Sequence, residues 1–123
     1  MMGEKQLFAI RGAVQCRNEA ADITDQVSGL YDEILRLNSL DEEAIVSVVF
    51  SVTGDLDEKN PAAALRQSGR AQNLALFAVQ EARVKGGLER TIRVLIHCYL
   101  PPETEIRHSY RNGAEVLRPD RAP

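Results

Sequence analysis

Bulky and small residues alternate near the start of the chain, and this alternation predicts a strand over residues 6–14. One face of that strand is bulky and apolar, with Phe8, Ile10 and Val14. The other face is small and charged, with Leu7, Ala9, Arg11 and Ala13. Apolar residues then recur at helical spacing between Glu19 and Leu37, at Ile23, Val27, Leu30, Ile34 and Leu37. This stripe predicts a long amphipathic helix, with Asn18 as its cap.

The second half of the chain predicts shorter elements. A β-branched run over residues 44–53 predicts a strand with two different faces: Val46, Val48, Phe50 and Val52 on one, and Ser47, Ser51 and Thr53 on the other. Asn60-Pro61 predicts the start of a short helix that carries Arg66 and ends near Gly69. Residues 74–80 and 91–99 predict two strands on either side of a turn at Gly86-Gly87. Residues 106–110 and 114–117 flank Asn112-Gly113, the strongest short signal for a hairpin.

These elements predict an α/β (α+β) fold, a mixed sheet of five to six strands with one long and one short helix. The 123 residues suit one domain, with residues 118–123 as a loose tail. Two helices cover only one face of such a sheet. The other face holds Arg11 and Arg93 among small residues, so we expect copies of the chain to meet over it and to form charged pockets where they join.

The net charge and the cysteine content exclude several kinds of partner and site. A formal net charge of -3 gives no basic field to attract nucleic acid or anionic lipid, so we expect neither as a partner. Cys16 and Cys98 are too few for a disulfide framework, and we expect both to be reduced and buried. The sequence shows no signal-peptide apolar region and no membrane span, which predicts a cytoplasmic protein.

Motifs for nucleophilic, metal or nucleotide chemistry do not occur in the sequence. His97 and His108 are isolated from each other and from the cysteines, so we expect neither a metal nor a cofactor. Arginine dominates the basic residues, 12 to 3 over lysine, which fits either a compositional bias or bidentate binding of carboxylates. An arginine in a strand needs an anionic partner. Either an internal pair, such as Arg93 with Glu81, or an anionic ligand would meet this need. Spacing alone leaves both interpretations open.

A series of short segments decides between them. In chain order they are Ile10-Arg11-Gly12-Ala13, Val79-Gln80-Glu81, Gly86-Gly87-Leu88, Ile92-Arg93-Val94, Ile106-Arg107-His108, Tyr110 and Leu117-Arg118-Pro119-Asp120. In this order they resemble the monofunctional chorismate mutases of the trimeric pseudo-α/β-barrel type. The resemblance extends from about Ala9 to Asp120, nearly the whole chain.

The resemblance implies isomerisation of chorismate to prephenate in aromatic amino-acid biosynthesis, a unimolecular rearrangement that needs no nucleophile and no cofactor. By the same resemblance Arg93 would hydrogen-bond the ether oxygen, where charge develops in the transition state. The other implied roles are these: Arg11 and Tyr110 on the side-chain carboxylate, Glu81 on the ring hydroxyl, Arg66 and Arg118 on the ring carboxylate near the mouth, and Leu117 and Ala78 as further substrate contacts.

The resemblance also implies a homotrimer with its active sites between subunits. The sequence departs from the family pattern at three positions of the site: Ala78 where a cysteine is common, Asn60 where an aromatic residue can occur, and Ala63 where a lysine can occur. Ala78 would then contact the substrate only through its backbone N–H. These departures affect the details of substrate binding rather than the reaction.

Two other functions share part of this pattern. An imine hydrolase of the Rid family is also a trimer with an arginine between subunits, but it gives no reason for Glu81 beside two arginines. A non-catalytic carboxylate-binding trimer would have the same pockets without needing a cation at an ether oxygen. The substitution Arg93→Lys distinguishes these functions, because a mutase should lose turnover while keeping much of its ligand affinity.

Overall fold

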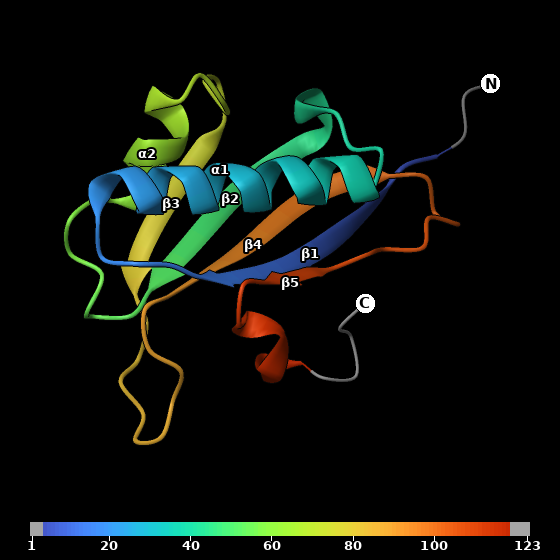
Figure 1. Cartoon of the computed structure of the whole chain (residues 1–123). Coiled ribbons are helices and arrows are strands. Elements are labelled where there is room, and N and C mark those ends of the chain that lie inside the picture. Colours follow the sequence, from blue (N-terminus) through green and yellow to red (C-terminus); the bar gives the residue numbers. More distant parts are fainter. Residues whose placement is uncertain (1–3, 119–123) are drawn as a thin grey trace.

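The computed structural model describes residues 4–118. Their strands form one mixed five-stranded sheet in the order β3-β2-β4-β1-β5 (Figure 1). The strands are β1 (Gln6–Gln15), β2 (Ile45–Val52), β3 (Ala75–Gln80), β4 (Thr91–Leu100) and β5 (Ser109–Arg111). Strand β4 pairs antiparallel with both β1 and β2, whereas β3 and β5 are parallel to their neighbours. The predicted mixed sheet is confirmed, with five strands.

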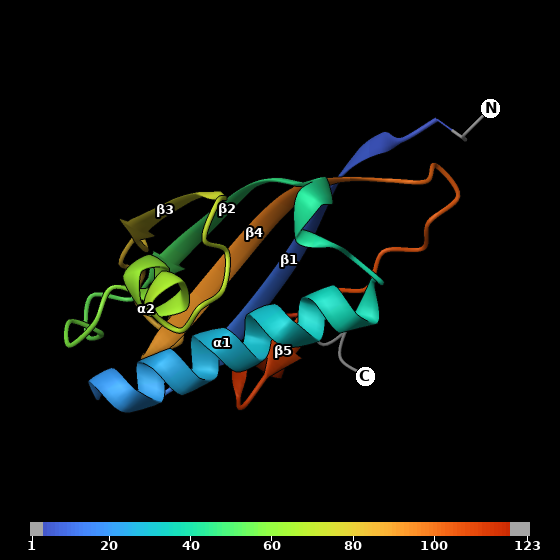
Figure 2. The ribbon, with the colours of Figure 1, turned by 90° about the horizontal axis from the view of Figure 1, so that it is seen from above.

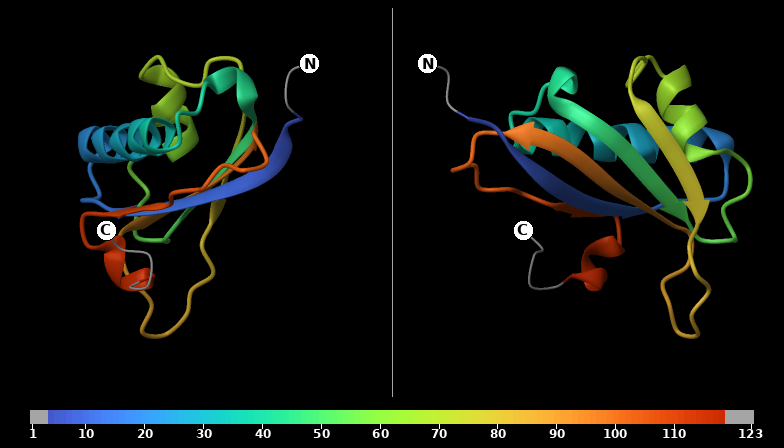
Figure 3. Two further views of the ribbon diagram at one scale, coloured as in Figure 1. Left: turned by 90° about the vertical axis from the view of Figure 1, so that its right-hand side faces the viewer. Right: turned by 180° about the vertical axis from the view of Figure 1, so that it is seen from behind.

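Both helices, α1 (Ala20–Leu37) and α2 (Pro61–Gln67), lie on the same side of the sheet (Figures 1 and 2). Seen from behind, the opposite face has no α-helix across it in the part of the chain that the structure describes (Figure 3). We call this opposite side the open face. Helix α2 begins as predicted, because the Asn60 side chain accepts hydrogen bonds from the N–H groups of Ala62 and Ala63 at 2.8 and 3.2 Å.

The main core lies between the helices and the sheet. Ile10 and Phe50, from the predicted bulky faces of β1 and β2, are fully buried there against Ile34 of α1. Cys16 and Cys98 are free and buried, as expected from the sequence. A second, small cluster forms on the open face, where Ala13, Tyr110 and Ala114 pack together with Leu88 and Leu117.

Strand β2 contains an irregularity that changes one predicted face. The register with β4 shifts between Ile45 and Ser47, as at a β-bulge. Ile45 is therefore buried, and Val46 is 49% exposed rather than packed with Val48 and Phe50. The predicted placement of Val46 on the same face as Val48 and Phe50 is wrong, because one extra residue reverses the alternation of faces before the bulge.

The predicted hairpin around Asn112-Gly113 is also wrong. Both residues have positive φ, 50° and 101°, as this dipeptide favours. However, β5 pairs in parallel with β1, and residues 114–117 form a 3-10 helix, η2 (Ala114–Leu117), instead of a returning strand. The helical turn buries Ala114 against Ala13 and Tyr110, an apolar contact that a local turn signal does not encode.

Asn18 is not the cap of α1, whose N-cap residue is Glu19. The side-chain oxygen of Asn18 instead accepts hydrogen bonds from the N–H groups of Asp57 and Glu58 at 3.0 and 3.1 Å. Asn18 thus ties the start of α1 to the loop before α2. The predicted tail begins at Arg118, and its remaining residues lie outside the described range. Neither α1 nor α2 is long and apolar enough to cross a membrane.

Candidate functional site

Sheet register brings the candidate residues into one row on the open face. Ser51 of β2 pairs with Arg93 of β4, Arg93 pairs with Ala13 of β1, and Ala13 pairs with Tyr110 of β5. Directly paired residues point to the same face of a sheet, so all four side chains lie on the open face. Arg11 lies two residues before Ala13 and is a diagonal neighbour of Arg93, at a typical spacing of about 7–8 Å.

This row borders a cleft of about 260 Å³. The cleft is lined by the predicted residues Arg11, Arg93, Tyr110, Leu117 and Arg118. Three guanidinium groups and a phenol at its wall suit an anionic ligand of small size, because a guanidinium donates paired hydrogen bonds to a carboxylate. The backbone N–H of Arg11 donates to Nδ1 of His108 at 2.9 Å, which fixes this part of β1 to the segment before β5.

Glu81 follows β3 and lies beside Arg93. Its carboxylate oxygen Oε1 is 3.5 Å from Nε of Arg93, so the internal pair left open by the sequence is present. The two side chains are 29% and 45% exposed. An ion pair with that much exposure contributes only about 0–1 kcal/mol, so an anionic ligand can compete for Arg93. The internal pair and a ligand-binding role are therefore compatible.

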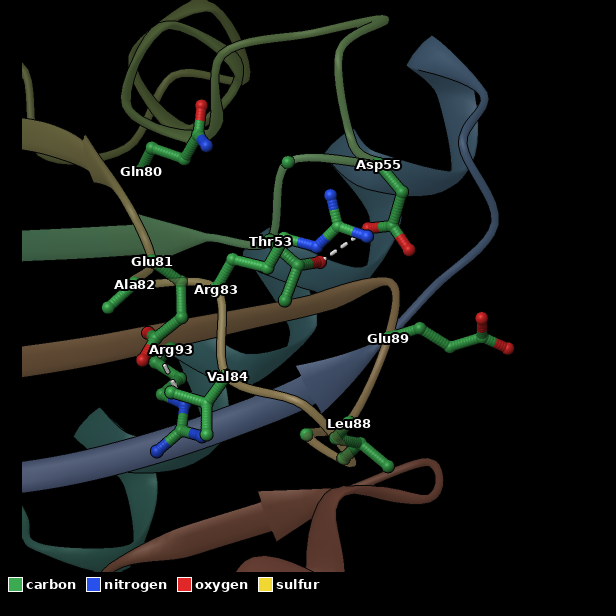
Figure 4. Close-up of a pocket in the computed structure, with 12 residues that line it drawn as sticks. Thr53, Asp55, Gln80, Glu81, Ala82, Arg83, Val84, Leu88, Glu89 and Arg93 are labelled. Carbon is green, nitrogen blue, oxygen red and sulfur yellow. Dashed lines mark hydrogen bonds and ion pairs between the residues drawn. The ribbon is translucent and has the colours of Figure 1, made fainter.

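A larger hollow of about 630 Å³ adjoins the cleft at Arg93 and is also lined by Glu81 (Figure 4). Its wall includes the loop between β3 and β4, which extends away from the sheet (Figure 1). Figure 4 shows the Glu81 and Arg93 side chains directed toward each other, while Gln80 points away. Asp55 holds the end of this loop, since its carboxylate accepts the Arg90 N–H at 3.1 Å.

Two of the predicted site residues lie elsewhere. Arg66 is on α2, on the helical side of the sheet, and donates to the Leu74 carbonyl at 3.0 Å. The Ala78 side chain packs against the main core. Alternation along β3 explains this, because residues 76, 78 and 80 face the helices when Glu81 faces the open side. Within one chain, Arg66 and Ala78 do not join the other six predicted residues.

The two histidines bind protein groups. His97 contacts the Ser47 hydroxyl through Nδ1 at 3.2 Å, and His108 accepts from Arg11. Across residues 4–118 no group of three or more His, Cys, Asp or Glu side chains is placed to hold a metal ion. Burial raises the pKa of the Cys16 thiol to about 11 and also raises the pKa of Cys98. Both thiols are thus protonated at neutral pH and poorly suited to act as nucleophiles.

The family model for chorismate mutase type I matches residues 7–121. The chain belongs to this family. Its match covers nearly all of the sequence, so the resemblance found in the short segments is confirmed. Proteins of the family are named for an isomerase activity.

Curated chorismate mutases from two bacteria are similar to this chain over most of its length. The chorismate mutase AroH of Bacillus subtilis is 34% identical over 113 residues, which are 90% of this chain and 89% of that protein. The chorismate mutase AroH of Thermus thermophilus is 35% identical over 114 residues, 90% of this chain and 93% of that protein. A solved chorismate mutase from Clostridium thermocellum aligns with a TM-score of 0.81 at 39% identity, covering 89% of this chain and 99% of that one.

One residue beside this cleft was not singled out by the sequence. Ser51 was counted only as a small polar residue on the open face of its strand. Its hydroxyl donates a hydrogen bond to Oε1 of Glu81 at 2.6 Å. The contact depends on the pairing of β2 with β3 and β4, which alternation within a single strand does not reveal.

Proposed function

We propose that this chain is a chorismate mutase that converts chorismate to prephenate in aromatic amino-acid biosynthesis. The observation that carries the proposal is the convergence of Arg11, Arg93 and Tyr110 on one cleft, with Glu81 beside it. Membership of the chorismate mutase type I family supplies the substrate. The cationic groups of the cleft match the two carboxylates of chorismate.

The reaction itself explains why this set of residues is sufficient. One C–O bond breaks while one C–C bond forms within a single molecule, and no proton or electron passes to the protein. The protein needs to hold chorismate in its compact conformer and to stabilise the negative charge that develops on the ether oxygen. Binding groups placed for the transition state therefore supply the rate enhancement.

The residues at and beside the cleft have the roles that the family resemblance implies, and their chemistry suits those roles. Arg93 donates to the ether oxygen, where a fixed cation counts most as charge develops. Arg11 and Tyr110 hold the side-chain carboxylate, and Glu81 accepts a hydrogen bond from the ring hydroxyl. The Glu81 carboxylate also favours the positive charge that the ring acquires as the ether oxygen becomes negative. Leu117 contributes an apolar contact to the same wall.

The site is proposed to be completed by a second copy of the chain, in a homotrimer that forms a pseudo-α/β barrel. Within residues 4–118, large apolar side chains exposed on the open face are Leu7, Phe77, Val79 and Tyr99. Exposed apolar residues gathered on one face typically mark a contact surface. Arg66 and Ala78, which lie apart from the cleft of their own chain, would reach the cleft of a neighbour. Arg66 and Arg118 would then draw in the ring carboxylate at the mouth.

The substitution Arg93→Lys tests the catalytic role of this cleft. Lysine keeps the charge but loses the rigid fork of donors, so turnover of chorismate should fall by at least about a hundredfold, the size of effect found when a transition-state donor is lost. Affinity for a substrate-like dicarboxylate should change little. Arg36→Lys is the matched control, because Arg36 is exposed on α1, on the helical side of the sheet, and forms a 3.8 Å ion pair with Glu33. Equal turnover in Arg93→Lys and wild type would contradict the catalytic role of Arg93. If the protein were instead a Rid-like hydrolase or a carboxylate-binding trimer, even the wild type would show no chorismate turnover.

Mixing two inactive variants tests the shared site. Arg93→Ala and Arg66→Ala each remove one side of every site, and subunits exchanged between them should assemble some sites that have both arginines. Activity above the sum of the two parents is expected after exchange. A mixture that stays at that sum although light scattering shows a trimer would contradict the sharing, as would a stable monomer at assay concentration.

A further inference from the structure

Ser51 is a residue of β2 that lines the cleft and contacts Glu81 at the end of β3. We propose that Ser51 is the residue that positions the Glu81 carboxylate, acting through Glu81 rather than on the substrate; this role rests on the function proposed above. Ser51 is half-buried, lines the cleft, and occupies the row that also contains Arg93, Ala13 and Tyr110.

Distances at the carboxylate show which neighbour holds it. The Ser51 hydroxyl donates to Oε1 of Glu81 at 2.6 Å, within the range of a charge-assisted O–H···O⁻ bond. Nε of Arg93 is 3.5 Å from the same oxygen, beyond the usual range of an N–H···O hydrogen bond. The serine hydroxyl therefore makes the close contact, and the arginine adds only a looser electrostatic attraction.

The backbone of Glu81 is fixed next to this contact. The Glu81 N–H donates to the Val52 carbonyl at 2.7 Å, which ties the end of β3 to the residue after Ser51. The backbone bond sets where the side chain begins, and the Ser51 hydroxyl sets where its carboxylate ends. A glutamate side chain has several rotatable bonds, so fixing both ends removes most of its freedom.

This arrangement separates two tasks that would otherwise compete. The proposed mechanism needs Arg93 to turn its donors toward the ether oxygen and needs Glu81 to remain at the ring hydroxyl. A carboxylate held by Arg93 alone would follow the guanidinium or block it. Because Ser51 holds the carboxylate independently, Arg93 can release it without Glu81 losing its place. The loose 3.5 Å contact is consistent with an arginine that exchanges partners.

Ser47 supplies a matched control on the same strand and the same face. It lies four residues before Ser51, and its hydroxyl contacts His97 at 3.2 Å instead of Glu81. A serine on this face of β2 therefore does not contact Glu81 merely because it lies on this face. Ser47→Ala should leave turnover of chorismate unchanged, whereas Ser51→Ala should not.

The decisive comparison is between Ser51→Thr and Ser51→Val. The two side chains have nearly the same shape and both suit a strand, but threonine has a hydroxyl where valine has a methyl group. We expect Ser51→Thr to keep turnover near wild type and Ser51→Val to lower kcat about tenfold, the effect of losing a hydrogen bond to a charged group. KM should change less than kcat, because the ring charge that Glu81 stabilises develops in the transition state. Ser51→Ala serves as a second variant if valine does not fit; melting temperature and light scattering check folding and assembly.

A double-mutant cycle separates positioning from a purely structural role. In a Glu81→Ala background the hydroxyl has no carboxylate to hold, so Ser51→Ala should cause no further loss. The same fold-loss with and without Glu81 would overturn the inference, as would wild-type kcat in both Ser51→Val and Ser51→Ala.

Crystal structures decide the inference separately from the proposed function. In Ser51→Ala the Glu81 carboxylate should leave residue 51 and close on Arg93, to less than the 3.5 Å of the wild type. A carboxylate that stays in place would overturn the role of Ser51. A wild-type protein that fails to convert chorismate would instead refute the proposed function, and the position of the carboxylate would still decide the positioning role.

Discussion

Gly12 of β1 lies close to α1 and to β5. A methyl group at this position would be 2.9 Å from Cδ1 of Ile34, 2.9 Å from the Ser109 carbonyl oxygen and 3.1 Å from Cδ1 of Leu30. The Ser109 oxygen belongs to the backbone that pairs with Gly12, so it can move only if β5 moves. Gly12→Ala should therefore destabilise the fold and displace the neighbouring Arg11 and Tyr110.

The size of this effect follows from two opposing contributions. Overpacking a well-packed site costs about 1–3 kcal/mol. Replacing glycine lowers the entropy of the unfolded chain and offsets about 0.4–1 kcal/mol of that cost. A net destabilisation of about 1–2 kcal/mol is expected. Urea denaturation followed by circular dichroism measures it, with wild type and variant at one protein concentration because assembly contributes to stability.

Gly29→Ala is the matched control within α1. Its methyl group would have the guanidinium of Arg111 as its nearest neighbour, at 2.9 Å from Nη1, and the end of that side chain can swing away. Alanine is favoured over glycine inside a helix by about 1 kcal/mol. Gly29→Ala should thus be neutral or stabilising. Equal stability of Gly12→Ala and wild type would refute the packing argument, and so would a loss in Gly29→Ala as large as that in Gly12→Ala.

Two further predictions concern buried groups away from the cleft. The Tyr31 hydroxyl donates to Oε2 of Glu42 at 2.5 Å, and the same oxygen accepts the Ala71 N–H at 2.9 Å. Tyr31→Phe should therefore lower the free energy of unfolding, measured by urea titration, by about 1–3 kcal/mol. An unchanged free energy would show that this hydrogen bond contributes nothing to stability. The folded-state pKa of Cys16 is raised from 9.0 to about 11, so the fold favours the neutral thiol. Stability from this group is full below pH 9 and is lost as the pH rises through about 11. Unfolding free energy should therefore fall less steeply over this interval in Cys16→Ala than in the wild type; identical slopes would contradict the raised pKa.

Periodic patterns were sufficient to predict the regular elements. The stripe from Ile23 to Ile34 identified α1, and alternation identified both faces of β1, because each pattern reports a face that the same segment must bury. The patterns failed where a distant partner decides the structure. Asn112 and Gly113 adopt the positive φ that their sequence favours, but β5 pairs with the free edge of β1. The bulge at Ile45 depends in the same way on the register with β4.

The candidate site shows the same division between local and distant information. Strand faces predicted Arg11 and Arg93 together on the open side of the sheet, and the register adds that they are diagonal neighbours. Sequence could not predict that Ser51 holds Glu81, since this contact joins two strands whose pairing is set by the whole sheet. It also could not show that Arg66 lies on the far side of the sheet in its own chain.

Conversion of chorismate by the purified wild-type protein is the most direct test of the proposed activity. Chorismate and prephenate can be separated by chromatography and followed over time against a buffer blank and against Arg93→Ala. Loss of chorismate well above the blank is expected, with an equal amount of prephenate formed and with most of the acceleration absent in Arg93→Ala. No acceleration over the blank by a folded wild-type protein would contradict the proposal.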